Sequence, residues 1–321
     1  MRKGRIKRLL LGTGIILVVL LALLVYSFTP ADLDVSAYPE PVFQASLSGA
    51  SALPETSLSL IKCGKMMSKQ VFVFRGGNWS EGYDSGMAAV LVRHPKGTLL
   101  FDTGFGANVD EHIKTIPALM RLLTTYDKET SAAAQLQAHG VDPNEIEMAI
   151  ISHSHWDHVS GLEDFPRAEA WFSKQELDDI PTLPAGELIQ QMKSKLKLRA
   201  FEFAGSPYEN FDRSLDLFGD TSIVLVPLPG HTPGSIGMFV NLRSGKRFFF
   251  IGDLTWALEG IELPAERPWI SRKLVDRNEE QVRAAIVKVH QLMKRYPDLV
   301  VVPAHDRRVH DRIANFPALE H

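Results

Sequence analysis

The chain contains a single cysteine, Cys63, among its 321 residues, and it has no excess of positive charge. One cysteine cannot form an internal disulfide, so packing and any bound metal must stabilise the fold. The 35 basic residues are outnumbered by 38 acidic ones, whereas a nucleic-acid-binding face needs a basic surface. We therefore predict no nucleic-acid partner. The content of 45% hydrophobic and 23% charged residues is typical of a globular protein with a large core.

Acidic residues are absent before Asp32, although five of the first eight residues are basic. Residues 9–31 carry no charge, and about 20 apolar residues of helix suffice to cross the hydrocarbon of a bilayer. Because a basic cluster stays in the cytoplasm, we predict a tail over 1–8 and a single inner-membrane anchor over 9–28, with the rest facing the periplasm. The alternative is a cleaved signal peptide, which would give a periplasmic or secreted protein, but residues 26–30 offer no convincing cleavage site.

The following segment, residues 29–56, is rich in alanine, serine and proline and shows no sustained period. This composition predicts a linker that holds the body away from the membrane. The remaining residues, 57–321, are then one catalytic domain. Its hydrophobic patterns predict strands over 58–62, 70–74, 87–92, 98–101, 145–151, 168–172, 222–226, 236–242, 247–251 and 299–302, and helices over 131–139, 173–179, 184–198 and 278–296.

Four residues with metal-ligating side chains follow the expected strand 145–151 within six positions: His153, His155, Asp157 and His158. On an extended segment, side chains two apart point the same way, so His153 and His155 can bind one ion. Asp157 and His158 come after the chain turns and would face a second ion. Neutral imidazoles with carboxylates suit zinc best, although iron, manganese or cobalt can occupy such ligands. A polar strand end with solvated histidines is the alternative, which further ligands downstream disfavour.

Other candidate ligands also follow expected strands. His231 lies in Pro-Gly-His-Thr-Pro-Gly, where prolines and glycines fix the backbone, and it supplies a third imidazole beside His153 and His155. Asp253 ends an apolar strand, where a buried carboxylate needs a cationic partner, so we predict that it bridges two metals. His305 completes the second site. Asp102 could simply shape a turn, but with the other ligands present we expect it to orient them.

Taken together, these elements resemble the metallo-β-lactamase superfamily over residues 57–305. The resemblance rests on Asp102-Thr103-Gly104, His153-x-His155-x-Asp157-His158, Pro229-Gly230-His231, Gly252-Asp253 and Ala304-His305, in that order. It implies an α/β fold, an αββα four-layer sandwich, here preceded by the transmembrane helix. It also implies two zinc ions per chain, the first on His153, His155 and His231, the second on Asp157, His158 and His305, with Asp253 between them.

Among members of the superfamily, the chain is most similar to the N-acyl homoserine lactonase-like and esterase members. The histidine directly after Asp157, His158, is similar to the two-metal hydrolases of the superfamily, whereas classical β-lactamases usually carry another residue at that position. Those lactonases typically have a tyrosine three residues after the bridging aspartate, where this chain has Trp256. An indole polarises a carbonyl less well than a phenol does, so lactone cleavage is one candidate among several.

The predicted function is hydrolysis of a lactone or related ester by a metal-bridging hydroxide. Asp157 or Asp253 would relay the proton to the leaving alkoxide. Alternatives on the same centre are a thioester hydrolase like glyoxalase II, a β-lactamase or a phosphoesterase, and a more distant one is a non-catalytic binding protein. We expect a small hydrophobic substrate, bound by the stretch 188–211 and by the aromatic residues Trp79, Tyr83, Trp156, Trp256 and Trp269. The oligomeric state stays open.

Overall fold

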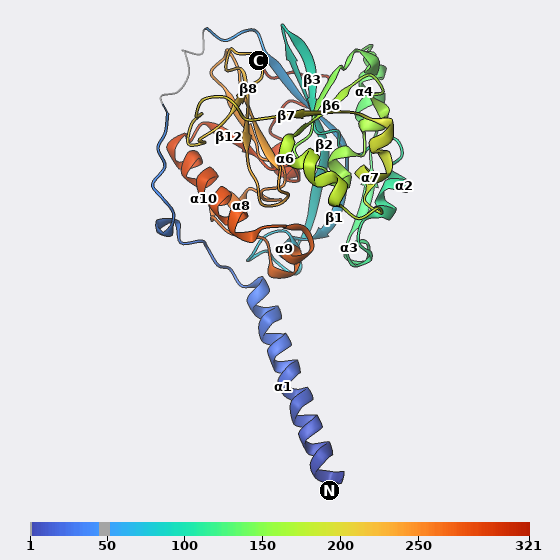
Figure 1. Ribbon diagram of the computed structural model, residues 1–321, viewed down its shortest axis with the longest axis vertical. Coiled ribbons are helices and arrows are strands. Elements are labelled where there is room, and N and C mark those ends of the chain that lie inside the picture. Colours follow the sequence, from blue (N-terminus) through green and yellow to red (C-terminus); the bar gives the residue numbers. More distant parts are fainter. Residues whose placement is uncertain (1, 45–51) are drawn as a thin grey trace.

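The computed structural model describes residues 2–44 and 52–321, in which two β-sheets form the centre of the body (Figure 1). The first sheet has the strand order β4-β1-β2-β3-β5-β6-β7 and the second the order β12-β11-β10-β9-β8. The strands of the first sheet are β1 (Ser57–Lys69), β2 (Gly82–His94), β3 (Gly97–Phe101), β4 (Thr125–Lys128), β5 (Met148–Ile150), β6 (Glu169–Ser173) and β7 (Lys197–Phe201). Those of the second are β8 (Leu215–Asp216), β9 (Ile223–Pro227), β10 (Ile236–Asn241), β11 (Arg247–Phe250) and β12 (Leu299–Val302).

Helices cover the outer face of each sheet. In Figure 1, α8 and α10 lie on one side of the body and α2, α4 and α7 on the other. The helices are α1 (Arg2–Phe28), α2 (Val109–His112), α3 (Ala118–Leu123), α4 (Ala132–Ala138), α5 (Trp156–Val159), α6 (Lys174–Asp179), α7 (Leu188–Met192), α8 (Glu259–Glu262), α9 (Trp269–Val275), α10 (Glu279–Arg295) and α11 (Arg307–His310). The predicted αββα four-layer sandwich is confirmed.

The alternation of side chains along the strands produces these layers. In β10, Met238 and Val240 point into the cluster between the two sheets, whereas Phe239 points outward and stacks on Phe249 with ring centroids 3.8 Å apart. The outer side is covered by α10, whose buried residues include Ile286 and Val289. Asn278 caps this helix, its side chain accepting hydrogen bonds from the backbone N–H groups of the first turn.

Two of the expected elements are wrong. Residues 70–74 do not form a strand, because β1 ends at Lys69 and Gln70–Phe72 form a 3-10 turn. Val73 and Phe74 instead pack beside Tyr83 in a small apolar cluster. The single helix expected over 184–198 is also absent, since α7 ends at Met192 and Lys197 begins β7, an edge strand beside β6.

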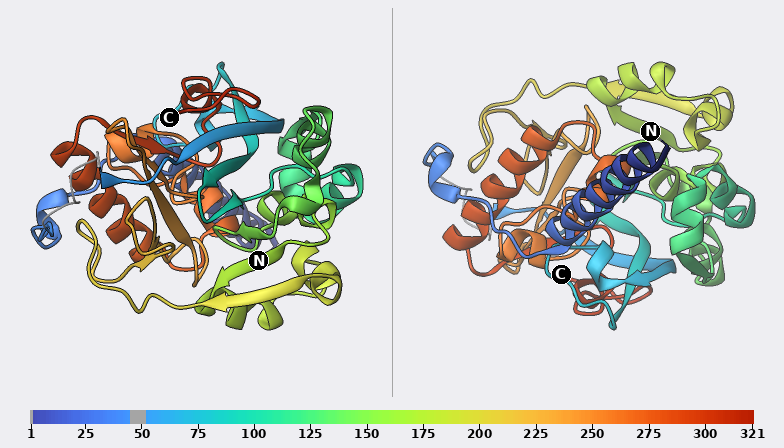
Figure 2. Two further views of the ribbon diagram at one scale, coloured as in Figure 1. Left: turned by 90° about the horizontal axis from the view of Figure 1, so that it is seen from above. Right: turned by 90° about the horizontal axis from the view of Figure 1, so that it is seen from below.

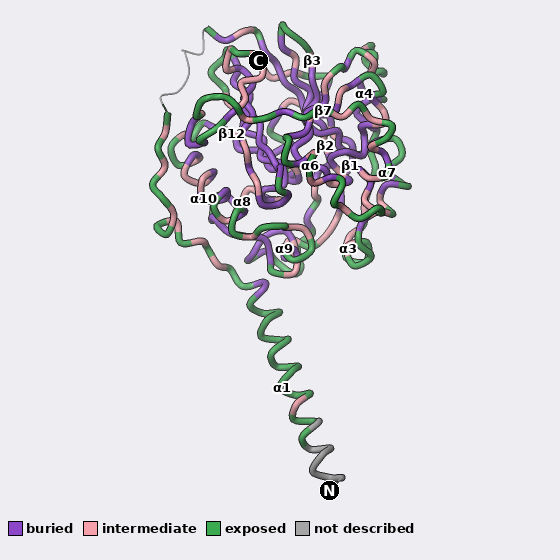
Figure 3. Tube along the Cα trace, in the orientation of Figure 1, coloured by how far each residue is buried: buried purple, intermediate pink, exposed green. Residues whose placement is uncertain are grey.

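The helix α1 leaves the body at the face that carries α9 (Figure 1). Most of its described residues are exposed (Figure 3). Its segment Leu10–Phe28 has a mean hydropathy of 2.6, in the range of a membrane span or of a signal sequence. The division of the chain at 8, 28 and 56 stays a prediction.

Residues 29–44 do not hold the body away from α1. The Arg75 guanidinium donates hydrogen bonds to the carbonyl oxygens of Tyr26 and Thr29, each 2.9 Å long, which ties the end of α1 directly to the body. The chain then runs back along the body, where Leu33 donates its N–H to the carbonyl of Pro264. The described part of this segment thus lies against the body, and its role as a linker stays a prediction; residues 45–51 lie outside the described residues.

Candidate metal centre

The candidate metal ligands come from both sheets and meet at one edge. β5 leads into the loop with His153 and His155, and α5 carries Asp157 and His158. β9, β11 and β12 lead into His231, Asp253 and His305. β11 and β12 are parallel, and β9 runs in the same direction because β10 is antiparallel to both β9 and β11. All three strands therefore deliver their side chains at the same end of the second sheet.

Three imidazoles form the first group. His155 Nδ1 lies 3.1 Å from His153 Nε2 and 2.9 Å from His231 Nε2. Three ring nitrogens that converge in this way cannot all be satisfied by one another, because each contact needs one proton and one lone pair. A cation that accepts all three lone pairs resolves the conflict, and three-His sets are typical of zinc.

The second group joins Asp157, His158 and His305, with Asp253 between the two groups. His305 Nε2 lies 3.2 Å from Asp157 Oδ2 and 2.9 Å from Asp253 Oδ1, and His158 Nε2 lies 3.3 Å from Asp253 Oδ1. On the other side, His231 Nε2 is 3.5 Å from Asp253 Oδ2. Despite these short distances, His158 Nε2 and Asp253 Oδ1 are buried and make no hydrogen bond within residues 2–44 and 52–321. Buried polar atoms of this kind require a partner, and a cation fits the donor set.

The outward nitrogens of four histidines are held by acceptors. His158 Nδ1 lies 2.8 Å from Asp102 Oδ2, His231 Nδ1 2.9 Å from Asp276 Oδ1, His305 Nδ1 2.9 Å from the Gly86 carbonyl and His153 Nδ1 3.1 Å from Ser152 Oγ. Such contacts fix the ring orientation and leave the inward nitrogen free to bind a metal. The donor set therefore fits a two-metal centre.

The charge of the site differs between its two halves. Burial, together with the charge of His231, lowers the pKa of His155 to about 3, and burial also lowers the pKa of His153 well below its usual value. Burial opposes protonation of His305 too, but Asp253 and Asp157 outweigh it and raise the pKa of His305 to about 10. Positive charge is therefore favoured beside the two carboxylates, and a divalent cation there would satisfy the same attraction.

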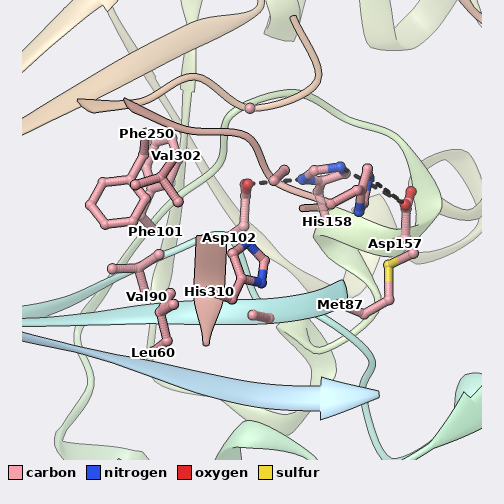
Figure 4. Close-up of a pocket in the computed structure, with 14 residues that line it drawn as sticks. Leu60, Met87, Val90, Phe101, Asp102, Asp157, His158, Phe250, Val302 and His310 are labelled. Atoms are coloured by element: carbon pink, nitrogen blue, oxygen red, sulfur yellow. Dashed lines mark hydrogen bonds and ion pairs between the residues drawn. The ribbon is translucent and has the colours of Figure 1, made fainter. Parts of the chain in front are cut away.

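Asp102 lies behind this half of the site, at a positive φ of 54° directly after β3. Besides His158, its carboxylate accepts hydrogen bonds from the N–H and hydroxyl of Ser152 at 2.7 and 2.8 Å. Figure 4 shows His158 between Asp102 and Asp157, with the apolar side chains of Phe101, Phe250 and Val302 on the other side of Asp102. Asp102 thus contacts both a candidate ligand and the start of the loop that carries two others.

Two acidic residues beside the site were not expected from the sequence. Glu176 of α6 is buried and accepts hydrogen bonds from Ser154 in one histidine loop and from Thr232 in the other. Asp276 follows α9 and is also bonded to Arg267, which in turn donates to the backbone carbonyl of Asp253. Neither residue belongs to a local motif. His310 is buried beside Gly86 and lines the small cavity of Figure 4.

We expect Asp276→Asn to lower metal retention and hydrolysis by roughly 10–100-fold, the usual cost of removing a partner that orients a ligand. His231 Nδ1 and Arg267 both contact Asp276 Oδ1, and Arg267 also contacts Oδ2. The amide removes the negative charge that both side chains face and turns an NH₂ group toward the guanidinium. Metal per chain after dialysis and kcat/KM measure the loss. Asp298→Asn, at an exposed position, is the control. Equal metal content and rates in the two variants would contradict an orienting role for Asp276.

A cavity of about 180 Å³ opens in front of the candidate ligands, with His155, Asp157, His231, Asp253 and His305 at its base. Trp156 and Trp256 line it, as expected. The other walls are mainly apolar and come from β1 and the turn after it, from α3 and the residues just before it, and from α9; they include Met66, Phe72, Ile116, Met120, Leu123, Ile270 and Leu274. Sequence reasoning missed α3 and α9, which are short and have no distinctive motif.

Three of the expected aromatic residues do not line this cavity. Trp79 is 57% exposed and packs on Phe28 of α1, with ring centroids 4.6 Å apart. Tyr83 is buried, and its hydroxyl donates to the carbonyl of Trp256. Trp269 points outward from α9, while its neighbour Ile270 faces the cavity. The stretch 188–211 is also absent from the walls, because it forms α7 and β7 at the far edge of the first sheet.

Comparison with known proteins agrees with this geometry. The model of the family described as "Metallo-beta-lactamase superfamily" matches residues 85–305, more than half of the chain. The chain belongs to this superfamily, and it is a metal-dependent hydrolase.

Among curated proteins, it is 27% identical over 236 residues to a probable metallo-hydrolase of Mycobacterium tuberculosis, covering 68% of this chain and 73% of that protein. It is 26% identical over 249 residues to the N-acyl homoserine lactonase AttM of Rhizobium radiobacter, covering 75% of this chain and 88% of that protein.

Among solved structures, an N-acyl homoserine lactone hydrolase with the product N-hexanoyl-L-homoserine at its catalytic metal centre has a TM-score of 0.67 at 16% identity. The match covers 84% of this chain and all of that one. The dizinc lactonase AidC has a TM-score of 0.56 at 17% identity, covering 87% and 92%.

Proposed function

We propose that the protein is a dinuclear zinc hydrolase that cleaves a lactone or related ester of a small hydrophobic substrate. The observation that carries this proposal is the convergence of five imidazoles and two carboxylates at the base of one apolar cavity. Two metals in such a site would supply an activated water and positive charge for the carbonyl oxygen. Iron, manganese or cobalt could occupy the same ligands.

The chain's own residues would position the ester and move the proton. Both Asp157 and Asp253 border the cavity. Burial raises the pKa of a carboxyl group, but the charges of His158 and His305 outweigh it and lower the pKa of both aspartates, so both are ionised at neutral pH. One of these carboxylates can accept a proton from the attacking water and pass it to the leaving alkoxide. Asp157, the more exposed of the two, is the better placed for this transfer.

Trp256 has a different role from that of a carbonyl-polarising tyrosine. Its Nε1–H donates a 2.8 Å hydrogen bond to Asp253 Oδ2, and the Arg267 guanidinium lies over its ring, 4.7 Å from the centroid. The indole is thus engaged by the carboxylate and forms a cavity wall. We propose that Trp256 orients Asp253 and does not polarise the substrate carbonyl. That polarisation would come from the bound metals.

We further propose that α1 is an uncleaved anchor in the inner membrane and that the body faces the periplasm. The basic residues before Leu9 and the charge-free segment after them support this orientation. After the membranes are washed with alkaline carbonate, we expect the protein to remain in them and to have the mass of the full-length chain. A shorter chain released to the soluble fraction would identify a signal peptide instead.

The test of the hydrolase proposal is a panel of chromogenic lactone, ester, thioester, β-lactam and phosphodiester substrates, offered to the full chain with and without a chelator. We expect the lactones or esters to be hydrolysed fastest, and chelation to abolish turnover because each candidate ligand faces a cation site. Metal analysis should give two ions per chain. A preference for one of the other bonds would replace the substrate class, and turnover that survives removal of all metal would defeat the proposal.

A further inference from the structure

The cavity opens between two short helices that expose large apolar side chains to solvent. α3 and α9 both contribute to its walls, and Figure 1 places both helices at the end of the body where α1 leaves. Soluble proteins rarely leave a contiguous group of large apolar side chains exposed without a partner. The exposed residues here, which we call the apolar rim, are Trp79, Leu119, Leu122, Leu123, Trp269 and Leu274.

The apolar rim is joined to α1 by contacts that leave little freedom between them. Phe28, the last residue of α1, is buried against Trp79 and Phe72, with ring centroids 4.6 and 5.7 Å apart. Ser27 Oγ accepts a hydrogen bond from Ile270 N at the start of α9. With the Arg75 bonds described above, these contacts fix the end of α1 beside the cavity mouth. The view from below in Figure 2 looks onto this face with α1 in front of it.

The length of α1 sets where a bilayer would end. The apolar segment Leu10–Phe28 has 19 residues, which as α-helix extend about 28 Å, close to the roughly 30 Å hydrocarbon thickness. No residue separates the apolar segment from the body, because Phe28 is the last residue of the segment and is also buried in the body. A bilayer crossed by α1 must therefore have its surface at the level of the apolar rim.

We propose that the apolar rim rests in the outer surface of the bilayer that α1 crosses, and that the substrate is an amphiphilic ester or lactone which enters the cavity from the lipid. This inference rests on the proposed anchor and the proposed hydrolase function. Tryptophans such as Trp79 and Trp269 favour the membrane interface. The exposed Arg121 and Lys273, on α3 and α9, can reach lipid phosphates from the same level.

The single native cysteine allows a direct test of the surface. Cys63 is fully buried, and burial raises the pKa of its thiol to about 12, so a thiol reagent at neutral pH will label only an introduced cysteine. Leu122→Cys places a fluorophore on α3 at an 80% exposed position. Val42→Cys is the matched control, because Val42 is 76% exposed and precedes Phe43, which packs at the far end of α10.

The labelled full chains are reconstituted in vesicles of phosphatidylcholine and phosphatidylglycerol that contain a spin-labelled lipid. We expect an emission shift to shorter wavelength and strong quenching for the label at 122, and neither for the label at 42. Equal emission and equal quenching at the two positions would overturn the proposed membrane surface.

A second variant tests the substrate route separately. Leu122→Asp changes the apolar rim but not the cavity walls. We expect roughly a tenfold loss of kcat/KM for a long-chain ester carried in vesicles, the approximate effect of losing one buried leucine, and an unchanged rate for a short water-soluble ester. Equal rates of the variant and the parent protein on both esters, or equal losses on both, would overturn entry from the lipid. Absence of hydrolysis of either ester by the parent protein would contradict the proposed ester substrate, and with it the entry route, whereas the fluorescence result would stand by itself.

Discussion

Replacing His153 with alanine should lower hydrolysis by on the order of a thousandfold, because a bound metal contributes several kcal/mol of transition-state stabilisation. His153 belongs to two groups of candidate ligands, one with His155 and His231 and the other with His158 and Asp253. Its ring is fully buried, so a side chain from the surface cannot reach this position to replace it as a ligand. Rates on the best substrate of the panel, together with metal content per chain, measure the effect.

The control for this variant is His139→Ala. His139 is exposed at the end of α4, and its Nδ1 contacts only the carbonyl of Gln135 among the hydrogen bonds of the described chain. It should keep full activity and metal content. His153→Ala should also keep its circular dichroism spectrum, because the sheets that carry the site are held by the core between them. A His153→Ala variant with parental rates would refute the assigned centre.

Much of the fold and of the candidate ligand set could be predicted from the sequence because the signals are local. The histidines and aspartates follow apolar strands, and His231 stands among prolines and glycines that restrict its backbone. Asp276 could not be predicted in this way, since it reaches His231 from 45 residues away and has no distinctive neighbours. The residues of the cavity walls could not be predicted either, because an apolar residue on a short helix can face the core, a cavity or solvent. Trp79 illustrates this ambiguity: its aromatic ring packs on α1 and not on the substrate cavity.

The second large effect should come from Glu176, which lies outside the cavity but joins the two loops of the first histidine group. Its Oε1 accepts hydrogen bonds from the N–H and hydroxyl of Ser154 at 2.8 and 2.6 Å. Its Oε2 accepts from the Thr232 hydroxyl at 2.6 Å and from the N–H of Gly234 at 3.1 Å. Ser154 lies between His153 and His155, and Thr232 follows His231. Because the loops come from different sheets, this carboxylate determines how closely the imidazoles approach.

We expect Glu176→Ala to lower the free energy of unfolding by about 3–5 kcal/mol, since each buried donor left without an acceptor costs about 1–3 kcal/mol and two of the four are backbone N–H groups. Metal binding and hydrolysis should fall with it, because His231 is no longer held at 2.9 Å from His155. Denaturant unfolding of the metal-free and metal-loaded chains separates the two effects. The metal-free variant should already be destabilised.

Glu176→Gln provides the sharper comparison, because it keeps the volume of the side chain. Its single oxygen can serve either Ser154 or the pair Thr232 and Gly234, while the NH₂ group faces donors on the other side. We therefore expect an intermediate loss of stability. Glu262→Ala, at an exposed position on α8, should leave unfolding and activity unchanged. If Glu176→Ala unfolds at the same denaturant concentration as Glu262→Ala, the carboxylate does not hold the loops together, and the packing of α6 against Gly234 must position them instead.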